Sequence, residues 1–130
     1  MSELNFRAWH KKYKRYYDVD AIDFYNRDVS YVFNDYVNQE QSLEYFSFDE
    51  VIIEQYTGLK DVNGTEIYEG DIFKFKHGNN WKKESYFEVT FSRSFGYILR
   101  NKNGDWFPLK AKANGNEVIG NIHENPELLD

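Results

Sequence analysis

The stretch from Gln55 to Ile72 constrains the fold more than any other part of the chain. It contains three glycines, Gly58, Gly64 and Gly70, each following a residue that favours a turn or the end of a strand. Glycine adopts a positive φ at no steric cost, and the Asp71 side chain can bond to the backbone of a turn. The stretch therefore predicts short strands joined by tight glycine turns.

Aromatic residues make up 19% of the 130 residues, with eleven tyrosines and eleven phenylalanines. Such residues favour pleated, half-buried surfaces. They alternate with polar residues in two runs, at Phe73 and Phe75 and again at Phe87, Val89 and Phe91. A period of two indicates strands, so we expect a meander of about five strands from Glu66 to the C-terminus.

Asn-Gly steps between apolar runs are strong hairpin signals. The clearest is the run Asn101–Gly104, which lies between Tyr97–Arg100 and Asp105–Leu109. The same pattern predicts turns at Asn63–Gly64 and Asn114–Gly115. Pro126 should end the last strand and begin a turn or a one-turn helix.

The N-terminal half contains fewer turn signals. Leu4–Trp9 and Tyr16–Phe24 are expected to be two strands joined by a basic turn, and Val51–Tyr56 a more buried strand. Residues Asn34–Tyr45 are the only candidate for a short helix, or for a long surface loop, because no apolar stripe forms there. The expected fold class is mainly β: a small barrel or strongly bent antiparallel sheet, with an N-terminal β hairpin region and at most one short helix.

A chain of this length suits one compact domain over residues 1–130, or two small units, 1–57 and 58–130, that share a core. A division would fall near Thr57–Asn63. The sequence contains no cysteine, which excludes disulfides, thiolate metal sites and cysteine nucleophiles. The N-terminus lacks a signal-peptide pattern and no apolar run could cross a bilayer, so we expect a cytoplasmic protein without a membrane partner.

Charge is unevenly distributed in a chain whose net charge is −6. Basic residues cluster near the N-terminus, and the following segment to Glu54 is strongly acidic. The acidic total argues against charge-driven attachment to nucleic acid, which depends on neutralising phosphates. Segregated charge can hold subunits together as readily as it can hold a polyanion. The basic cluster comprises Arg7, Lys11, Lys12, Lys14 and Arg15.

The basic turn is the best candidate for a binding site. Aromatic faces can stack on bases while lysine and arginine follow the phosphates of a single strand. The same interleaving also suits a half-buried sheet with a solvated face, the more common case. A second patch of this type includes Lys74, Lys76, His77, Trp81, Lys82 and Lys83. The candidate binding residues of the turn are Trp9, Lys11, Lys12, Tyr13, Lys14 and Arg15.

No catalytic constellation is present in the sequence. His10, His77 and His123 lie in separate segments without a ligand partner at metal-binding spacing, so neither a metal nor a cofactor is expected. Glu66, Glu69 and Asp71 cluster around a turn, where paired carboxylates could perform acid–base chemistry. Carboxylates beside a turn glycine more often bond to the backbone, which is the structural interpretation we favour.

Three blocks in this order resemble the YopX family of bacteriophage and prophage proteins. They are the opening Leu4–Trp9, the glycine-rich run Gln55–Ile72 and the closing Val118–Leu129, whereas the stretch from about Asp28 to Asp49 matches no block. The resemblance implies a small, mainly β phage protein that can form homo-oligomers. The family has no established biochemical function or agreed catalytic residues, so no active site is carried over.

Three functions follow from these observations. The favoured one is a non-enzymatic phage accessory protein that assembles with itself and binds an unidentified phage or host protein, given the aromatic surplus and the segregated charge. One alternative is a protein that binds single-stranded nucleic acid through the basic, aromatic N-terminal hairpin. The other alternative is a small hydrolase that uses the turn carboxylates or His123.

Overall fold

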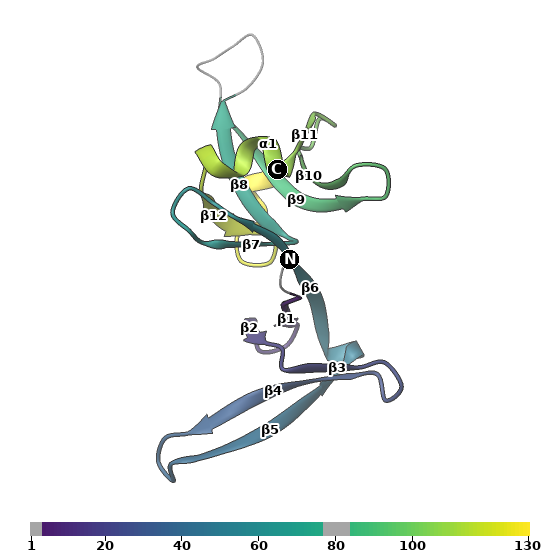
Figure 1. The fold of residues 1–130 in the computed structure, drawn as a ribbon, viewed down its shortest axis with the longest axis vertical. Coiled ribbons are helices and arrows are strands. Elements are labelled where there is room, and N and C mark those ends of the chain that lie inside the picture. The colour runs from purple at the N-terminus through teal and green to yellow at the C-terminus, as the bar shows by residue number, and fades with distance from the viewer. Residues whose placement is uncertain (1–3, 77–83) are drawn as a thin grey trace. The chain divides into compact units, whose positions relative to one another are not determined.

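The computed structural model describes residues 4–76 and 84–130, which fold into two compact units. The N-terminal unit is Leu4–Gln55 and the C-terminal unit is Tyr56–Asp130. Both are built from antiparallel strands, so the mainly β prediction is confirmed (Figure 1). One strand, β6 (Val51–Lys60), contributes its first half to the N-terminal unit and its second half to the C-terminal unit.

In the N-terminal unit, β1 (Phe6–His10) lies between β2 (Arg15–Asp18) and the first half of β6. The predicted strand at Leu4–Trp9 is therefore confirmed as β1. The predicted strand Tyr16–Phe24 is instead two short strands, β2 and β3 (Ala21–Asp23). The chain changes sheets between them: Val19 N–H donates to the Phe6 carbonyl, and Asp20 N–H donates to the Ser30 carbonyl.

Strands β3, β4 (Asp28–Asp35) and β5 (Glu40–Ser47) form the second sheet of this unit. A short 3₁₀ helix, η1 (Phe48–Glu50), leads from β5 into β6. The core of the unit joins the two sheets, because side chains from both are buried against one another. Its buried members are Ala8, Val29, Phe46 and Val51.

Neither alternative for Asn34–Tyr45, a short helix or a long surface loop, matches the structure. This segment contains the end of β4, a turn at residues 36–39 and most of β5, in register from Asp28↔Ser47 to Asp35↔Glu40. The Asp35 carboxylate accepts hydrogen bonds from the N–H groups of Val37 and Asn38, which closes a turn where a helix would need to continue. The segment also lacks the apolar stripe that would have held a helix against the core.

The C-terminal unit is built on a five-stranded sheet with the order β11-β10-β9-β8-β12, curled into a half-barrel. Strands β8 to β11 follow one another as the predicted meander, while β12 pairs with the other edge of β8. The short strand β7 (Glu66–Tyr68) pairs with the second half of β6. The bounds of the sheet strands are β8 Asp71–Lys76, β9 Glu84–Ser92, β10 Gly96–Arg100, β11 Trp106–Pro108 and β12 Val118–Asn121.

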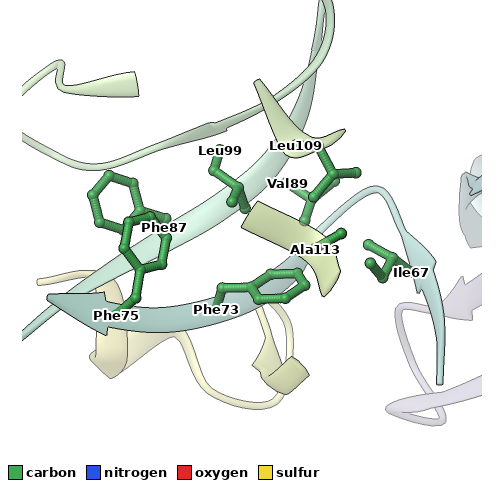
Figure 2. Packing of buried hydrophobic residues seen from close by; sticks show 8 residues of the cluster. All are labelled: Ile67, Phe73, Phe75, Phe87, Val89, Leu99, Leu109 and Ala113. Carbon is green, nitrogen blue, oxygen red and sulfur yellow. The ribbon is translucent and has the colours of Figure 1, made fainter. Parts of the chain in front are cut away.

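One face of this curled sheet forms the core of the unit (Figure 2). The Phe75 and Phe87 rings stack with centroids 4.3 Å apart, and both contact Phe107 edge to face. This buried aromatic area supplies much of the apolar burial that stabilises the unit. The whole buried cluster is Ile67, Phe73, Phe75, Phe87, Val89, Leu99, Leu109 and Ala113.

A short helix covers part of the core just before the turn predicted at Asn114–Gly115. Helix α1 (Leu109–Lys112) continues directly into a 3₁₀ turn, η2 (Ala113–Gly115), so the chain turns there after a helix and not between two strands. Leu109 and Ala113 are both buried, and their spacing of four residues places them on one helical face. At the C-terminus, Pro126 begins the 3₁₀ helix η3 (Pro126–Leu129), as predicted.

Candidate interaction surface of the N-terminal unit

The basic turn between β1 and β2 consists of Lys11, Lys12, Tyr13 and Lys14. The buried His10 side chain holds it in shape, because its Nδ1 accepts hydrogen bonds from the N–H groups of Lys12 (3.2 Å) and Tyr13 (3.0 Å). Lys14 ends the turn in the left-handed region, with φ 57°. Since Nδ1 accepts both bonds, the proton of the neutral His10 ring lies on Nε2.

His10 is enclosed by aromatic rings. Its ring stacks on Tyr13 at a centroid distance of 4.0 Å and meets Phe46 edge to face at 4.5 Å. Its buried Nε2 has no hydrogen-bond partner among the described residues. One face of Tyr13 is therefore already occupied by His10 and is not free to stack on a base.

The structure separates the candidate binding residues of this turn into two groups. Trp9 is buried and packs its edge against Tyr16, so it is not part of an exposed stacking surface. The side chains of Lys11, Lys12, Lys14 and Arg15 are exposed. Lys11 Nζ donates to the Asp49 carbonyl at 3.0 Å, and the Arg15 guanidinium lies over the Tyr17 ring. The turn and the start of β2 thus present four exposed cations, and the exposed aromatic ring among them, Tyr13, has one face covered by His10.

A buried ion pair beside the turn was not foreseen from the sequence. Arg7 Nε donates to Glu54 Oε1 at 2.9 Å, and the Tyr16 hydroxyl donates to the same oxygen. The Arg7 guanidinium also lies 4.1 Å from the Tyr16 ring centroid. Arg7 lies on β1, Tyr16 on β2 and Glu54 on β6. Arg7 and Glu54 are cross-strand partners, so their pairing depends on β1 lying beside β6.

The β4–β5 hairpin, residues 28–47, is the most unusual surface of this unit and is called the β4–β5 arm below. Figure 1 shows it as a long two-stranded ribbon. At its base Val29 pairs with Phe46 in the core, and the Tyr31 ring stacks on Phe46 at a centroid distance of 4.8 Å. Farther along the arm, Val32, Phe33 and Leu43 are exposed. At the tip, Tyr36 is 85% exposed and Val37 91% exposed.

One face of the arm carries a row of apolar side chains. Val32 and Leu43 are cross-strand partners, and Tyr45 follows Leu43 on the same face by the period of two. All three are substantially exposed. Beside them lies a groove of about 470 Å³, lined by Leu43 and Tyr45 together with the carboxylates of Asp20, Asp23 and Asp28. This face is both apolar and acidic.

The turn carboxylates of the C-terminal unit differ in burial. Asp71 is buried, and its Oδ2 accepts the Tyr68 N–H at 2.8 Å, while Glu66 and Glu69 are half-buried. In residues 4–76 and 84–130, no group of three histidine, aspartate or glutamate side chains is placed to hold a metal ion. The backbone N–H of His123 donates to Asn121 Oδ1, within the turn that follows β12.

The three glycines of the Gln55–Ile72 stretch all have positive φ: 86° at Gly58, 82° at Gly64 and 88° at Gly70. Gly64 and Gly70 lie in turns. Gly58 instead lies inside β6, where the register with β7 shifts, so this glycine marks a bulge rather than a turn between strands. Of the second basic patch expected from the sequence, residues 77–83 lie outside the described part of the chain.

Comparison with known proteins gives one family match. The model of the family described as "YopX protein" matches residues 5–130. No curated protein matches the chain. Over the whole chain, the fold is similar to the crystal structure of protein EF1440 from Enterococcus faecalis, at 26% identity and a TM-score of 0.67, with all of that chain covered.

A second solved structure, that of protein yopX from Bacillus subtilis, covers 100% of this chain and 98% of its own at 18% identity and a TM-score of 0.58. At that identity the likeness shows the fold alone. None of the helices within the described ranges has the length and apolar character needed to cross a bilayer.

Proposed function

Because the chain belongs to the YopX family, we propose that it is a non-enzymatic phage or prophage accessory protein, acting in the cytoplasm of its bacterial host, that assembles head to tail with copies of itself. In this assembly the apolar, acidic face of one β4–β5 arm receives the basic turn of the next copy. The same face would serve a phage or host protein that carries a basic segment. The observation that supports the proposal is the exposed apolar row on an acidic arm.

The β4–β5 arm has two features that favour a surface covered by a partner. An isolated two-stranded hairpin is marginally stable in water, and exposed contiguous apolar side chains commonly mark interaction sites. Val32, Leu43 and Tyr45 are such side chains, because they lie on the face of the arm opposite to the buried Val29–Phe46 pair. A partner that covers them would stabilise the arm and remove apolar area from water.

Charge favours a head-to-tail contact over a symmetric one. The groove on this face is lined by the carboxylates of Asp20, Asp23 and Asp28 and by no lysine or arginine of the described residues. The turn and the start of β2 contain four cations, Lys11, Lys12, Lys14 and Arg15, and no acidic residue. Two arms facing each other would bring like charges together, whereas an arm against a turn is complementary. Contacts of this type form rings or open filaments.

The first test places a cation in the acidic groove. Leu43→Lys removes an apolar contact and repels an incoming basic turn, so we expect the assembly to dissociate to monomers. Ser42→Lys is the matched control, because Ser42 is the neighbouring residue on the opposite face of β5 and should leave the assembly intact. Sedimentation velocity at about 50 and about 500 mM salt measures the mass, which should fall at high salt.

Mixing two variants distinguishes head-to-tail assembly from a symmetric dimer. Leu43→Lys retains its basic turn, and Lys12→Glu/Lys14→Glu retains its arm, so each should be monomeric alone. A mixture should form a one-to-one dimer that cannot extend, since only one complementary contact remains. A wild-type protein that stays monomeric at both salt concentrations would overturn self-assembly, and equal dissociation by Ser42→Lys would remove the arm face as its site.

A further inference from the structure

The C-terminal unit carries a second surface that self-assembly does not use. On the face of the curled sheet opposite the core lies a groove of about 790 Å³, built from β9, β10, β11 and the turns that join them. A row of register partners crosses it, from Glu88 through Arg100 to Trp106. Leu129 of η3 lines its border.

An aromatic platform lies in this groove. The Phe95 ring, from the loop after β9, and the Trp106 ring, from β11, have centroids 4.6 Å apart with an interplanar angle of 31°. Each ring supports the other, yet Phe95 remains 62% exposed and Trp106 41% exposed. Exposed aromatic rings held on a sheet are the surfaces on which bases stack in proteins that bind single strands.

Two cations accompany the platform. Arg100 is the cross-strand partner of Trp106, so the two side chains share a face, and Lys102 follows in the next turn. Both are exposed in a chain whose net charge is −6. Of the described residues that line the groove, Glu88, the partner of Arg100 on β9, is the acidic one. A planar ring that carries a negative group fits such a surface better than a neutral sugar does.

We infer that this groove binds a nucleotide, with the base on the Phe95–Trp106 platform and the phosphate at Arg100 and Lys102. The nucleotide comes either from single-stranded nucleic acid or from the free pool, since both present the same base and phosphate. The inference does not rest on the proposed self-assembly, because its residues belong to the other unit. It also differs from binding at the basic N-terminal turn, where Trp9 is buried and one face of Tyr13 is covered by His10.

Fluorescence anisotropy of a labelled oligothymidylate of twelve nucleotides measures binding of a single strand to the groove. Calorimetry with thymidine monophosphate measures binding of the free nucleotide. Trp106→Ala should weaken binding roughly tenfold, because stacking on one ring contributes about 1–3 kcal/mol. Lys102→Ala should weaken it less, and the loss should shrink as salt rises. Lys102 lies in an exposed turn, so this variant keeps the test valid if Trp106→Ala does not fold.

Two controls match the variants. Phe91→Ala removes an exposed aromatic ring and Lys110→Ala an exposed cation of the same unit, and neither residue lines the groove. Both should bind within about twofold of the wild type. Binding of the oligonucleotide alone identifies a strand site, and binding of both ligands identifies a mononucleotide site. Failure of both ligands to bind at millimolar concentration, or loss of binding in Lys12→Glu but not in Trp106→Ala, would overturn the inference.

Discussion

At the scale of single residues, the backbone at Gly70 shows why the glycine-rich stretch predicts so much. Its φ is 88°, its N–H donates to the Val89 carbonyl, and its carbonyl accepts the N–H of Ile122. A residue with a Cβ is strained at this φ, and both backbone bonds prevent the chain from rotating to relieve the strain. One glycine thereby joins β7 and β8 to two other segments of the C-terminal unit.

Gly70→Ala should lower the free energy of unfolding by about 1–3 kcal/mol, as expected for a left-handed conformation forced on a residue with a side chain. Gly115→Ala is the control, because Gly115 has no positive φ and a Cβ there would meet nothing within 4 Å. Urea denaturation of both variants measures the difference. Equal stability of the two would mean that the strain at Gly70 is relieved elsewhere in the unit.

At the scale of elements, the turns follow two sequence patterns, each with a side chain that accepts backbone N–H groups. In one, Asp61 and Asn101 each start an Asx-x-Asn-Gly turn, and Oδ1 of each accepts two backbone N–H groups. The predicted hairpin at Asn101–Gly104 and turn at Asn63–Gly64 are confirmed for this reason. Both starting residues are buried, so the side chains that shape these turns are fixed in place.

The second pattern occurs between β3 and β4 and between β4 and β5. Asp23 and Asp35 each accept the N–H groups of the residues two and three positions later, and each also accepts the side-chain amide of the asparagine three positions later. The fourth residue after each, Arg27 and Gln39, has a positive φ. His10 performs the same role before Lys14. An Asp-x-x-Asn spacing seen twice was the signal that could have replaced the predicted helix with a hairpin.

Asp35→Ala should loosen the tip of the β4–β5 arm without unfolding the unit. The amide protons of Val37 and Asn38 lose their acceptor, so their hydrogen exchange should accelerate roughly fivefold, for a hydrogen bond of about 1 kcal/mol. Glu40→Ala removes a carboxylate from the same arm and should leave exchange at the tip unchanged. Unchanged exchange in Asp35→Ala would show that the Asp35 side chain does not hold the turn.

At the scale of the whole molecule, Asp61 should make stability depend on acid. Burial raises the pKa of Asp61, but hydrogen bonds from the N–H groups of Val118, Thr65 and Asn63 outweigh burial, and the net pKa lies below the ordinary 3.8. The pKa of Asp23 is lowered by the Asn26 N–H and that of Asp35 by the Asn38 side chain, but both are exposed. Surface groups of this kind contribute little.

Because the pKa of Asp61 is lower in the folded state, this carboxylate takes up its proton at a higher pH in the unfolded chain than in the folded protein as the pH falls. The stability from Asp61 should be fully present above about pH 4 and should be lost as the pH falls through its folded-state pKa. Asp61→Asn should lower the free energy of unfolding at pH 7 by about 1–3 kcal/mol, because an amide cannot accept all three bonds. It should also flatten the decline between about pH 4 and 2.

Glu117→Gln is the matched control, since the exposed Glu117 carboxylate accepts one bond from the Asn63 side chain in the same region. Urea denaturation of each variant across the pH range checks the prediction. A wild-type acid dependence in Asp61→Asn would assign the effect to other carboxylates.

The sequence alone determined the features that local chemistry controls. Period-two alternation predicted the strands β8 and β9, Asn-Gly steps predicted two of the turns, and the three blocks pointed to the family. These predictions succeeded because a turn or a strand depends mostly on a few adjacent residues. At residues 34–45 the local Asp-x-x-Asn turn signal was missed. At Asn114–Gly115 the packing of Leu109 and Ala113 in the core placed the Asn-Gly step after a helix.

Tertiary structure decided the features that depend on which segments meet. The Arg7–Glu54 pair, the burial of His10 and Trp9, and the helical face of Leu109 and Ala113 arise from contacts between distant segments. The same holds for the exposed row on the β4–β5 arm, because a side chain's exposure depends on where the core ends. Alternation along a strand shows which residues share a face, but only packing decides which face remains open to a partner.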